Sequence, residues 1–396
     1  MVAVLFAVAL LPLTMAVGAA VDYSRASQMR VDLQSATDAA ALAVGRAAIE
    51  LGRLDNTAQA RQAFNAGFQP RSGAAVTRFA VVQTTQKLTV DVDASIPLAF
   101  GGVLGMASMT VNAKAEVPLD DITLEVALVL DNTGSMAAAG KMTALKTASK
   151  NLITKLQNAS VVNTNAFVAI VPFATQVRIP PSDPAPSWLR FKHPSDETEP
   201  KLNVDNPSWR GCIADRDQPY DANGTPPNTG QLNTLYPASR CDVSGLATVV
   251  PLNRYFDALR GHIDSMGTDG NTNTTIGLAG GFAVLTPSTL MNTGARQPGR
   301  FVKKHIIFLT DGQNTENRWT TDRALIDQRT QQICTAIKQS NLNIVLHSIR
   351  LMEGNTTLLE NCASTPQRYY FVTNPAQLNA VFDAIAAELL SIRLGA

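Results

Sequence analysis

The chain of 396 residues has little excess charge of either sign. Its 33 lysines and arginines are balanced by 32 aspartates and glutamates, and the formal net charge is +1. Proteins that bind nucleic acid usually carry a basic patch or a strongly basic balance. The composition therefore predicts a protein without a nucleic-acid partner.

Histidine and cysteine are also scarce, with four of each, and no Cys-x-x-Cys pair is present. Scattered residues of these types lack the spacing that a zinc site needs. No Gly-x-Ser-x-Gly turn, Cys/His pair or general acid–base pair argues for catalysis. We therefore expect a protein that is not an enzyme.

If the protein is exported, the even number of cysteines suggests disulfide bonds. Disulfide bonds persist in oxidising compartments such as the bacterial periplasm. Proximity along the chain suggests the pairs Cys212–Cys241 and Cys334–Cys362, although other pairings remain open. In a cytosolic domain the same residues would instead be four buried thiols.

The first part of the chain is apolar: residues 2–21 contain no charged side chain. An apolar helix of about 20 residues can cross the hydrocarbon core of a bilayer. The alternative is a cleaved secretory signal ending near Gly18-Ala19-Ala20, but such signals usually have a shorter apolar region that follows basic residues. We expect an uncleaved transmembrane anchor over residues 1–21, and the missing basic residues suggest a natural start upstream of Met1.

Residues 22–120 show two further patterns, which together predict a small α+β stalk or docking module. Strict alternation of apolar and polar residues over 88–96 and 109–117 is typical of half-buried antiparallel strands. Before them, an alanine-rich helix is expected over residues 28–48, with apolar residues at helical spacing: Leu33, Ala36, Ala40, Val44 and Ala47.

From residue 121 to 396 the pattern changes to apolar strands that alternate with amphipathic helices. This alternation predicts an α/β fold with a doubly wound, Rossmann-like sheet. An insertion at about 176–251, rich in Pro, Asn, Asp and Ser, interrupts it, and a stretch so long without regular structure is usually functional or flexible. The expected strands are 124–130, 167–173, 305–309, 343–349 and 368–372, and the expected helices are 142–156, 254–266, 275–285, 322–340 and 375–393.

Three short polar segments of this region are expected to meet. They are Asp-Asn-Thr-Gly-Ser at 131–135, Gly-Asn-Thr-Asn at 270–273 and Thr-Asp-Gly at 310–312. The first and third directly follow apolar strands, and ligands of open parallel sheets bind beyond the carboxyl ends of the strands. Two carboxylates and three hydroxyls suit a hard divalent cation such as Mg²⁺. Taken singly, each segment would be only a turn or a helix cap.

The three segments together resemble the von Willebrand factor A domain and its metal-ion-dependent adhesion site, in which the first loop reads Asp-x-Ser-x-Ser. The resemblance implies Mg²⁺, or Mn²⁺ or Ca²⁺, and a protein partner that offers an acidic residue to the metal. Thr274 and Thr275 compete with Thr272 for the second loop, but residues 272–278 meet the family pattern Thr-Asn-x-x-x-Gly-Leu. The implied metal ligands are Asp131, Thr133, Ser135, Thr272 and Asp311.

Residues 134–141 also approach the phosphate-binding pattern Gly-x-x-x-x-Gly-Lys-Ser/Thr. Here five residues separate Gly134 from Gly140, and Met142 follows Lys141. The loop is one residue too long to bring its amides and its lysine onto one phosphate. A nucleotide hydrolase is therefore only a distant alternative.

The N-terminal part resembles TadG-like and TadE-like proteins of the Tad (Flp) pilus apparatus. The resemblance rests on Val-Asp-Tyr at 21–23 and Leu-Gln-Ser-Ala-Thr-Asp-Ala-Ala-Ala-Leu-Ala at 33–43, and matching segments recur at 209–212, 333–334 and 361–364. It implies an envelope protein, anchored in the inner membrane with its bulk in the periplasm, that acts in pilus assembly, adhesion or secretion with pilus or secretion components as partners. The alternative is a freely secreted or surface adhesin that binds a host or matrix ligand.

Overall fold

A computed structural model describes most of the chain, namely residues 2–51, 57–70, 73–84, 87–101, 105–118, 122–160, 164–182, 185–192, 199, 201–202, 204–287, 294–299 and 302–390. The chain divides into two compact units near residue 121. The larger unit spans Ile122–Gln157 and Thr164–Leu389.

The N-terminal unit contains two helices and a three-stranded antiparallel sheet of order β1-β2-β3. Its elements are α1 (Val2–Leu51), α2 (Thr57–Gly67), β1 (Ala75–Gln83), β2 (Lys87–Pro97) and β3 (Ser108–Pro118). Both strands expected from alternation are present as β2 and β3. Neither α2 nor β1 was expected, and the sequence suggested two helical segments where α1 is one continuous helix.

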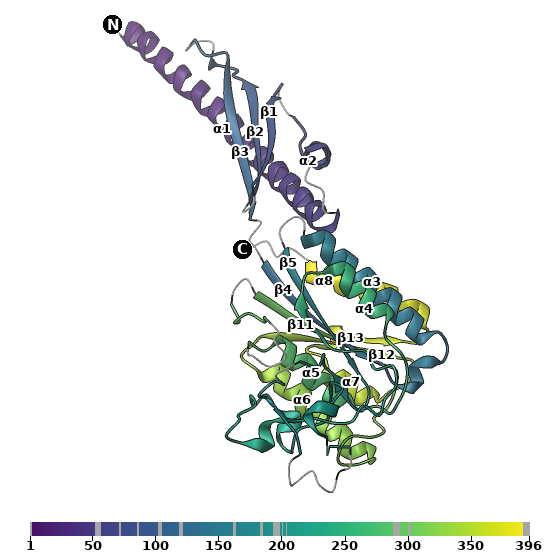
Figure 1. Cartoon of the computed structure of the whole chain (residues 1–396). Helices are drawn as coiled ribbons and strands as arrows, with labels where there is room; N and C mark the ends of the chain where they lie inside the picture. The colour runs from purple at the N-terminus through teal and green to yellow at the C-terminus, as the bar shows by residue number, and fades with distance from the viewer. Residues whose placement is uncertain are drawn as a thin grey trace. The chain divides into compact units, whose positions relative to one another are not determined.

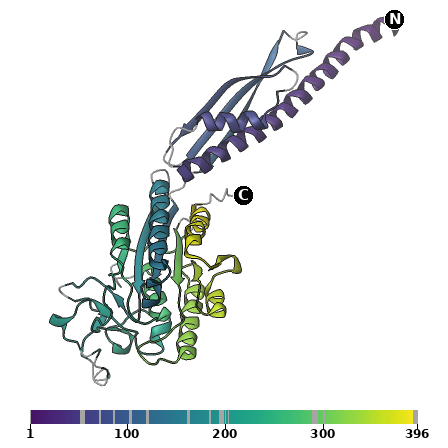
Figure 2. The same cartoon turned by 90° about the vertical axis from the view of Figure 1, so that its right-hand side faces the viewer.

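Helix α1 lies along the three-stranded sheet (Figure 2). Small buried side chains of the helix form the contact. Leu33, Ala36, Ala40 and Val44 are buried, as their spacing predicted, whereas the side chain of Ala47 lies outside the described part. Alanine at these positions lets the helix approach the strands closely. The apolar residues of β2 that face it are Leu88, Val90, Val92, Ala94 and Ile96.

The expected membrane anchor falls partly on residues 1–9 and 11–12, whose side chains lie outside the described part. Among the side chains that are described, no helix is both long enough and apolar enough to cross a bilayer.

The larger unit is built on a mixed sheet whose central strands are parallel, in the order β13-β12-β11-β4-β5 (Figure 1). Short antiparallel strands extend it beyond β5. The parallel strands are β4 (Ile122–Asp131), β5 (Thr164–Phe173), β11 (Val302–Thr310), β12 (Ile344–Leu351) and β13 (Tyr369–Val372); the antiparallel ones are β6 (Val177–Arg178), β8 (Cys212–Ile213) and β10 (Val250–Asn253).

Helices cover both faces of this sheet, as the α/β alternation predicted (Figure 1). Ion pairs Lys150–Asp264 and Lys155–Asp383 join the three helices of one face to each other. That face carries α3 (Lys141–Ser160), α4 (Phe256–Asp264) and α8 (Leu378–Leu390), and the other carries α5 (Thr274–Leu285), α6 (Arg323–Gln339) and α7 (Thr356–Cys362). The short α7 was not expected, and the end of the helix expected at 375–393 lies outside the described residues.

The insertion at 176–251 is more ordered than its composition suggested. Beyond β6 and β8 it contains β7 (Leu189–Arg190), which pairs with β9 (Tyr236–Pro237), and several single-turn 3₁₀ helices. Trp188, Trp209 and Tyr236 are buried and join the core of the larger unit. Strands of two residues leave no periodic pattern, so the sequence did not show these short pairings.

Both disulfide bonds suggested by proximity are present. Cys212–Cys241 lies within the insertion, and Cys334–Cys362 joins α6 to the end of α7. No described cysteine is free. The second bond therefore fixes the connection between two helices on the same face of the sheet.

Glycine in α5 allows this wholly buried helix to lie close to the sheet. A Cβ atom at Gly277 would be 2.6 Å from Cγ of Phe173 on β5. We expect Gly277→Val to lower the free energy of unfolding by about 1–3 kcal/mol through overpacking. Gly261→Ala is the matched control, because Gly261 is exposed on α4 with no atom within 4 Å of the added Cβ. Urea unfolding should show a lower midpoint for the first variant only; equal midpoints would contradict the packing.

Candidate metal centre

The first loop folds back on the end of β4. Asp131 ends the strand, and its Oδ1 accepts hydrogen bonds from the backbone N–H of Thr133 at 2.8 Å and from Thr133 Oγ1 at 2.6 Å. Thr133 Oγ1 is in turn 2.9 Å from Ser135 Oγ. The alternate spacing of these residues thus turns three oxygen-bearing side chains toward each other.

The third loop meets the first because β11 pairs in parallel with β4, with Leu309 opposite Leu130. Ser135 Oγ donates to Asp311 Oδ1 at 2.6 Å. Thr310 Oγ1 donates to the second oxygen of Asp131, also at 2.6 Å. Four of the five residues named from the sequence, all but Thr272, are therefore linked by direct contacts.

The second loop lies against both of the others. Gly134 N–H donates to the carbonyl of Gly270 at 3.0 Å. A Cβ atom at Gly312 would be 3.4 Å from Ser135 Oγ and 3.4 Å from Thr272 Oγ1, so glycine leaves room between these hydroxyls. The structure thus brings the hydroxyl of Thr272 to the residues of the first and third loops.

The two threonines that competed with Thr272 have other partners. The hydroxyls of Thr274 and Thr275 each lie 2.9 Å from Thr330 Oγ1 on α6. Thr274 Oγ1 also donates to Asn314 at 2.9 Å. These contacts engage both hydroxyls in packing α5 against α6.

Asp131 is fully buried at the end of β4. Burial, and then the negative charge of Asp311, raise the pKa of Asp131 to about 6. Hydrogen bonds from Thr133 and Thr310 act in the opposite direction. The negative charge of Asp311 therefore opposes the ionisation of Asp131, and a bound cation would relieve this opposition.

Lys141 is a site residue that the sequence did not identify as one. Its ammonium donates to Asp311 Oδ2 at 2.6 Å, and both side chains are buried. The lysine of the rejected phosphate-loop pattern thus points to a carboxylate. Lys141 is the first residue of α3. A positive charge at a helix N-terminus is unfavourable because of the helix dipole, so this position indicates a nearby acidic partner.

The donor set fits a hard divalent cation. Two carboxylates and three hydroxyls converge, and Lys141 neutralises only one of the two negative charges. No cluster of three or more His, Cys, Asp or Glu that could hold a metal occurs among the described residues. A metal here would therefore depend on hydroxyl oxygens and water for its remaining ligands, as Mg²⁺ readily does.

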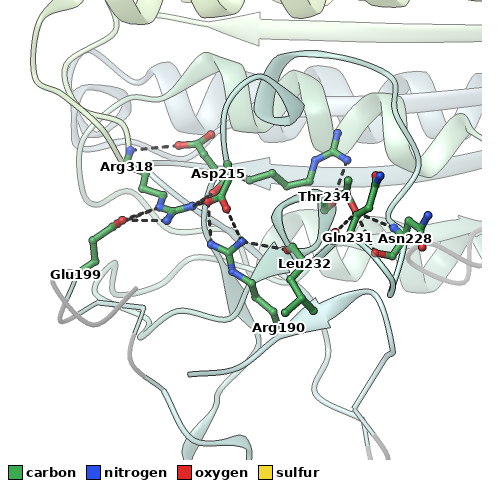
Figure 3. A network of polar contacts seen from close by, with 10 residues as sticks. Arg190, Glu199, Asp215, Asn228, Gln231, Leu232, Thr234 and Arg318 are labelled. Atoms are coloured by element: carbon green, nitrogen blue, oxygen red, sulfur yellow. Dashed lines mark hydrogen bonds and ion pairs between the residues drawn. The ribbon is translucent and has the colours of Figure 1, made fainter. Parts of the chain in front are cut away.

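The segment after Asp311 is tied to the insertion by an arginine network (Figure 3). Arg318 pairs with Glu199 and with Asp217, and Arg190 makes two hydrogen bonds to the same Asp217. Asp215 accepts hydrogen bonds from the backbone of Arg318 and from Asn273. Burial, and then the charge of Asp221, raise the pKa of Asp215 to about 7. The insertion thus supports the second and third loops.

Comparison with known families confirms both resemblances. Residues 1–48 match the family model "Putative Flp pilus-assembly TadE/G-like", and residues 243–384 match the von Willebrand factor type A domain. No curated protein sequence matches the chain.

Solved structures with similarity to the chain include two pilus proteins. The pilus adhesin SpaC from Lactobacillus rhamnosus GG shares 15% identity at a TM-score of 0.42, over 80% of this chain and 34% of that one. The vWF domain of the type V pili tip protein Mfa5 from Porphyromonas gingivalis shares 13% identity at a TM-score of 0.39, over 70% of this chain and 98% of that one.

A third solved structure is proximal thread matrix protein 1 from the mussel byssus, with a zinc-occupied MIDAS motif. It shares 13% identity at a TM-score of 0.36, over 68% of this chain and 46% of that one. The chain spans about a third of the length of SpaC. Likenesses this distant do not identify an activity or a partner.

Proposed function

We propose that this chain, which joins a TadE/G-like N-terminal segment to a von Willebrand factor type A domain, is a non-enzymatic envelope protein that binds a protein partner through a divalent metal. The observation that carries the proposal is the convergence of Asp131, Thr133 and Ser135 with Asp311 at the carboxyl edge of the parallel strands. The TadE/G-like segment supports a role in Tad (Flp) pilus assembly, adhesion or secretion.

The side chains of the three loops would supply different kinds of ligand to the cation. Asp131 and Asp311 would supply charge, and Thr133, Ser135 and Thr272 would supply neutral oxygens. A bound Mg²⁺, Mn²⁺ or Ca²⁺ would provide a positively charged position for an acidic side chain of the partner. Because hydroxyls add no charge, such a site would retain its attraction for a carboxylate.

The division of the chain into an anchor (1–21), a TadE/TadG-like helix and sheet (22–120) and the A domain (121–396) belongs to the same proposal. The separation of two compact units near residue 121 supports the second boundary. In this arrangement the A domain would be held in the periplasm by a single helix in the inner membrane.

The partner is tested by co-purification of Tad pilus or secretion components from cell envelopes. We expect them to accompany the wild-type chain in Mg²⁺ and to be lost with EDTA or with Asp131→Asn. Asp257→Asn is the control, because its side chain is 92% exposed on α4, away from the three loops. Co-purification that resists both EDTA and Asp131→Asn would contradict a metal-dependent partner site.

The anchor gives a separate prediction. The uncharged run at 2–21 is expected to keep the chain in the membrane fraction after carbonate extraction. A reporter that works only in the periplasm should be active when fused after Ala396. Release into the soluble fraction would favour the secreted adhesin, and an inactive reporter would contradict the orientation.

A further inference from the structure

The connection between β2 and β3 is unusually apolar. Residues 94–113, which include the ends of both strands, contain no charged side chain. The opposite end of the same sheet carries the ion pair of Lys87 with Glu116, and Arg78 pairs with Asp91 and Asp93 nearer the middle of the strands. The small sheet therefore has one uncharged end and one charged end.

The uncharged end also exposes large side chains, which we call the apolar rim: Phe100, Met106 and Met109. They are 50%, 49% and 38% exposed. Single exposed apolar residues are ordinary on protein surfaces, whereas a group of them marks an interaction site. The rim lines a cavity of about 350 Å³ together with Met15 and Ala19 of α1.

Contacts with α1 fix the position of the apolar rim along the axis of that helix. The carboxylate of Asp22 accepts the backbone N–H groups of Ala99 at 2.8 Å and Phe100 at 2.9 Å. A Cβ atom at Gly18 would be 2.8 Å from Cβ of Phe100, so Phe100 lies directly on that glycine. At about 1.5 Å of rise per residue, Gly18 is about 6 Å along the helix from Asp22, toward the N-terminus.

We propose that the apolar rim inserts into the outer edge of the lipid bilayer beside α1. The inference rests on the proposed anchor: if residues 2–21 cross the membrane, a side chain at the level of Gly18 lies inside the apolar boundary. The rim is continuous with Met15 of α1, which lines the same cavity and is 37% exposed. Exposed Tyr23, followed by Arg25, places an aromatic and a basic residue at the level of the headgroups, where both are favoured.

This second contact would orient the N-terminal unit on the membrane. With a single helix as its only membrane contact, the attached sheet could rotate about the membrane normal and tilt relative to it. With the rim inserted, the charged end of the sheet around Lys87 and Glu116 points into water.

The test uses the full chain in phosphatidylcholine vesicles with an environment-sensitive NBD label. Because every described cysteine is in a disulfide, Phe100→Cys provides a single labelling site. Val82→Cys is the matched control, because Val82 is 53% exposed and lies at the end of β1 beside the charged end of the sheet. Met106→Cys is a second variant in case loss of the Phe100 ring disturbs folding.

A label that lies about 5–10 Å into the boundary between headgroups and acyl chains should lose emission when the vesicles contain a lipid with a shallow acyl-chain nitroxide. We expect this loss at positions 100 and 106 and none at position 82. Equal quenching at 100 and 82 in vesicle-bound protein would overturn the rim contact and leave the anchor standing. A label at 100 shielded from both the nitroxide and aqueous iodide would overturn it in favour of a protein cover. Failure of the chain to float with vesicles would overturn the anchor and the rim contact together, without bearing on the metal site.

Discussion

Asp131→Asn is expected to abolish the stabilisation of the protein by Mg²⁺ or Mn²⁺. Loss of groups that merely support metal ligands costs about 10–100-fold in affinity, so loss of a ligand carboxylate should cost at least about 100-fold. A metal at 100 times its dissociation constant stabilises a folded protein by about 2.7 kcal/mol. Thermal unfolding in EDTA and in saturating Mg²⁺ should therefore differ for the wild type and coincide for the variant.

The same variant should remain folded without metal, and at least as stable as the wild type. Asparagine keeps the shape of Asp131, can accept from Thr133, and can donate to Thr310 Oγ1. It also removes a buried charge that faces Asp311. Asp257→Asn should behave as wild type in both conditions. A variant that gains as much stability from Mg²⁺ as the wild type would contradict Asp131 as a metal ligand.

Removal of the Cys334–Cys362 bond is expected to have the second large effect. The bond joins residues 28 apart, and a loop of that length is worth about 3–4 kcal/mol when closure restricts the unfolded chain. Replacing both cysteines with alanine should lower the urea midpoint by a corresponding amount. In that variant, reducing agent should lower the urea midpoint further only by breaking the Cys212–Cys241 bond, which joins residues 29 apart.

Two results would contradict this prediction. Non-reducing peptide mapping of protein from envelopes should find both bonds, and free thiols at all four positions would argue against an oxidising compartment. An unchanged midpoint in the double-alanine variant would show that the bond does not restrict the unfolded chain.

The long helices and strands were predictable because the buried face of each appears in the sequence as a regular spacing of apolar residues. The alternating strand β2 and the helical stripe of α1 show their buried faces directly in the sequence. Strand β1 was missed because most of its side chains are exposed or half-buried, without regular alternation. The seven-residue helix α7 was missed because it is too short to show a period.

The metal centre was predictable where its residues follow strands. Asp131 and Asp311 come directly after apolar runs that pair in parallel, so topology brings them together. The contact between Lys141 and Asp311 joins residues 170 positions apart, and no local pattern marks it. The burial of Asp131 likewise depends on Thr310 and on the neighbouring loops.

Calorimetric titration of the metal-free full chain with Mn²⁺ tests the central claim most directly. One binding site per chain, displaced by Mg²⁺ and absent in Asp131→Asn, is the result that the convergence of the three loops predicts. Equal affinity in the wild type and the variant, or no binding in either, would contradict a metal centre built from Asp131, Thr133, Ser135, Thr272 and Asp311.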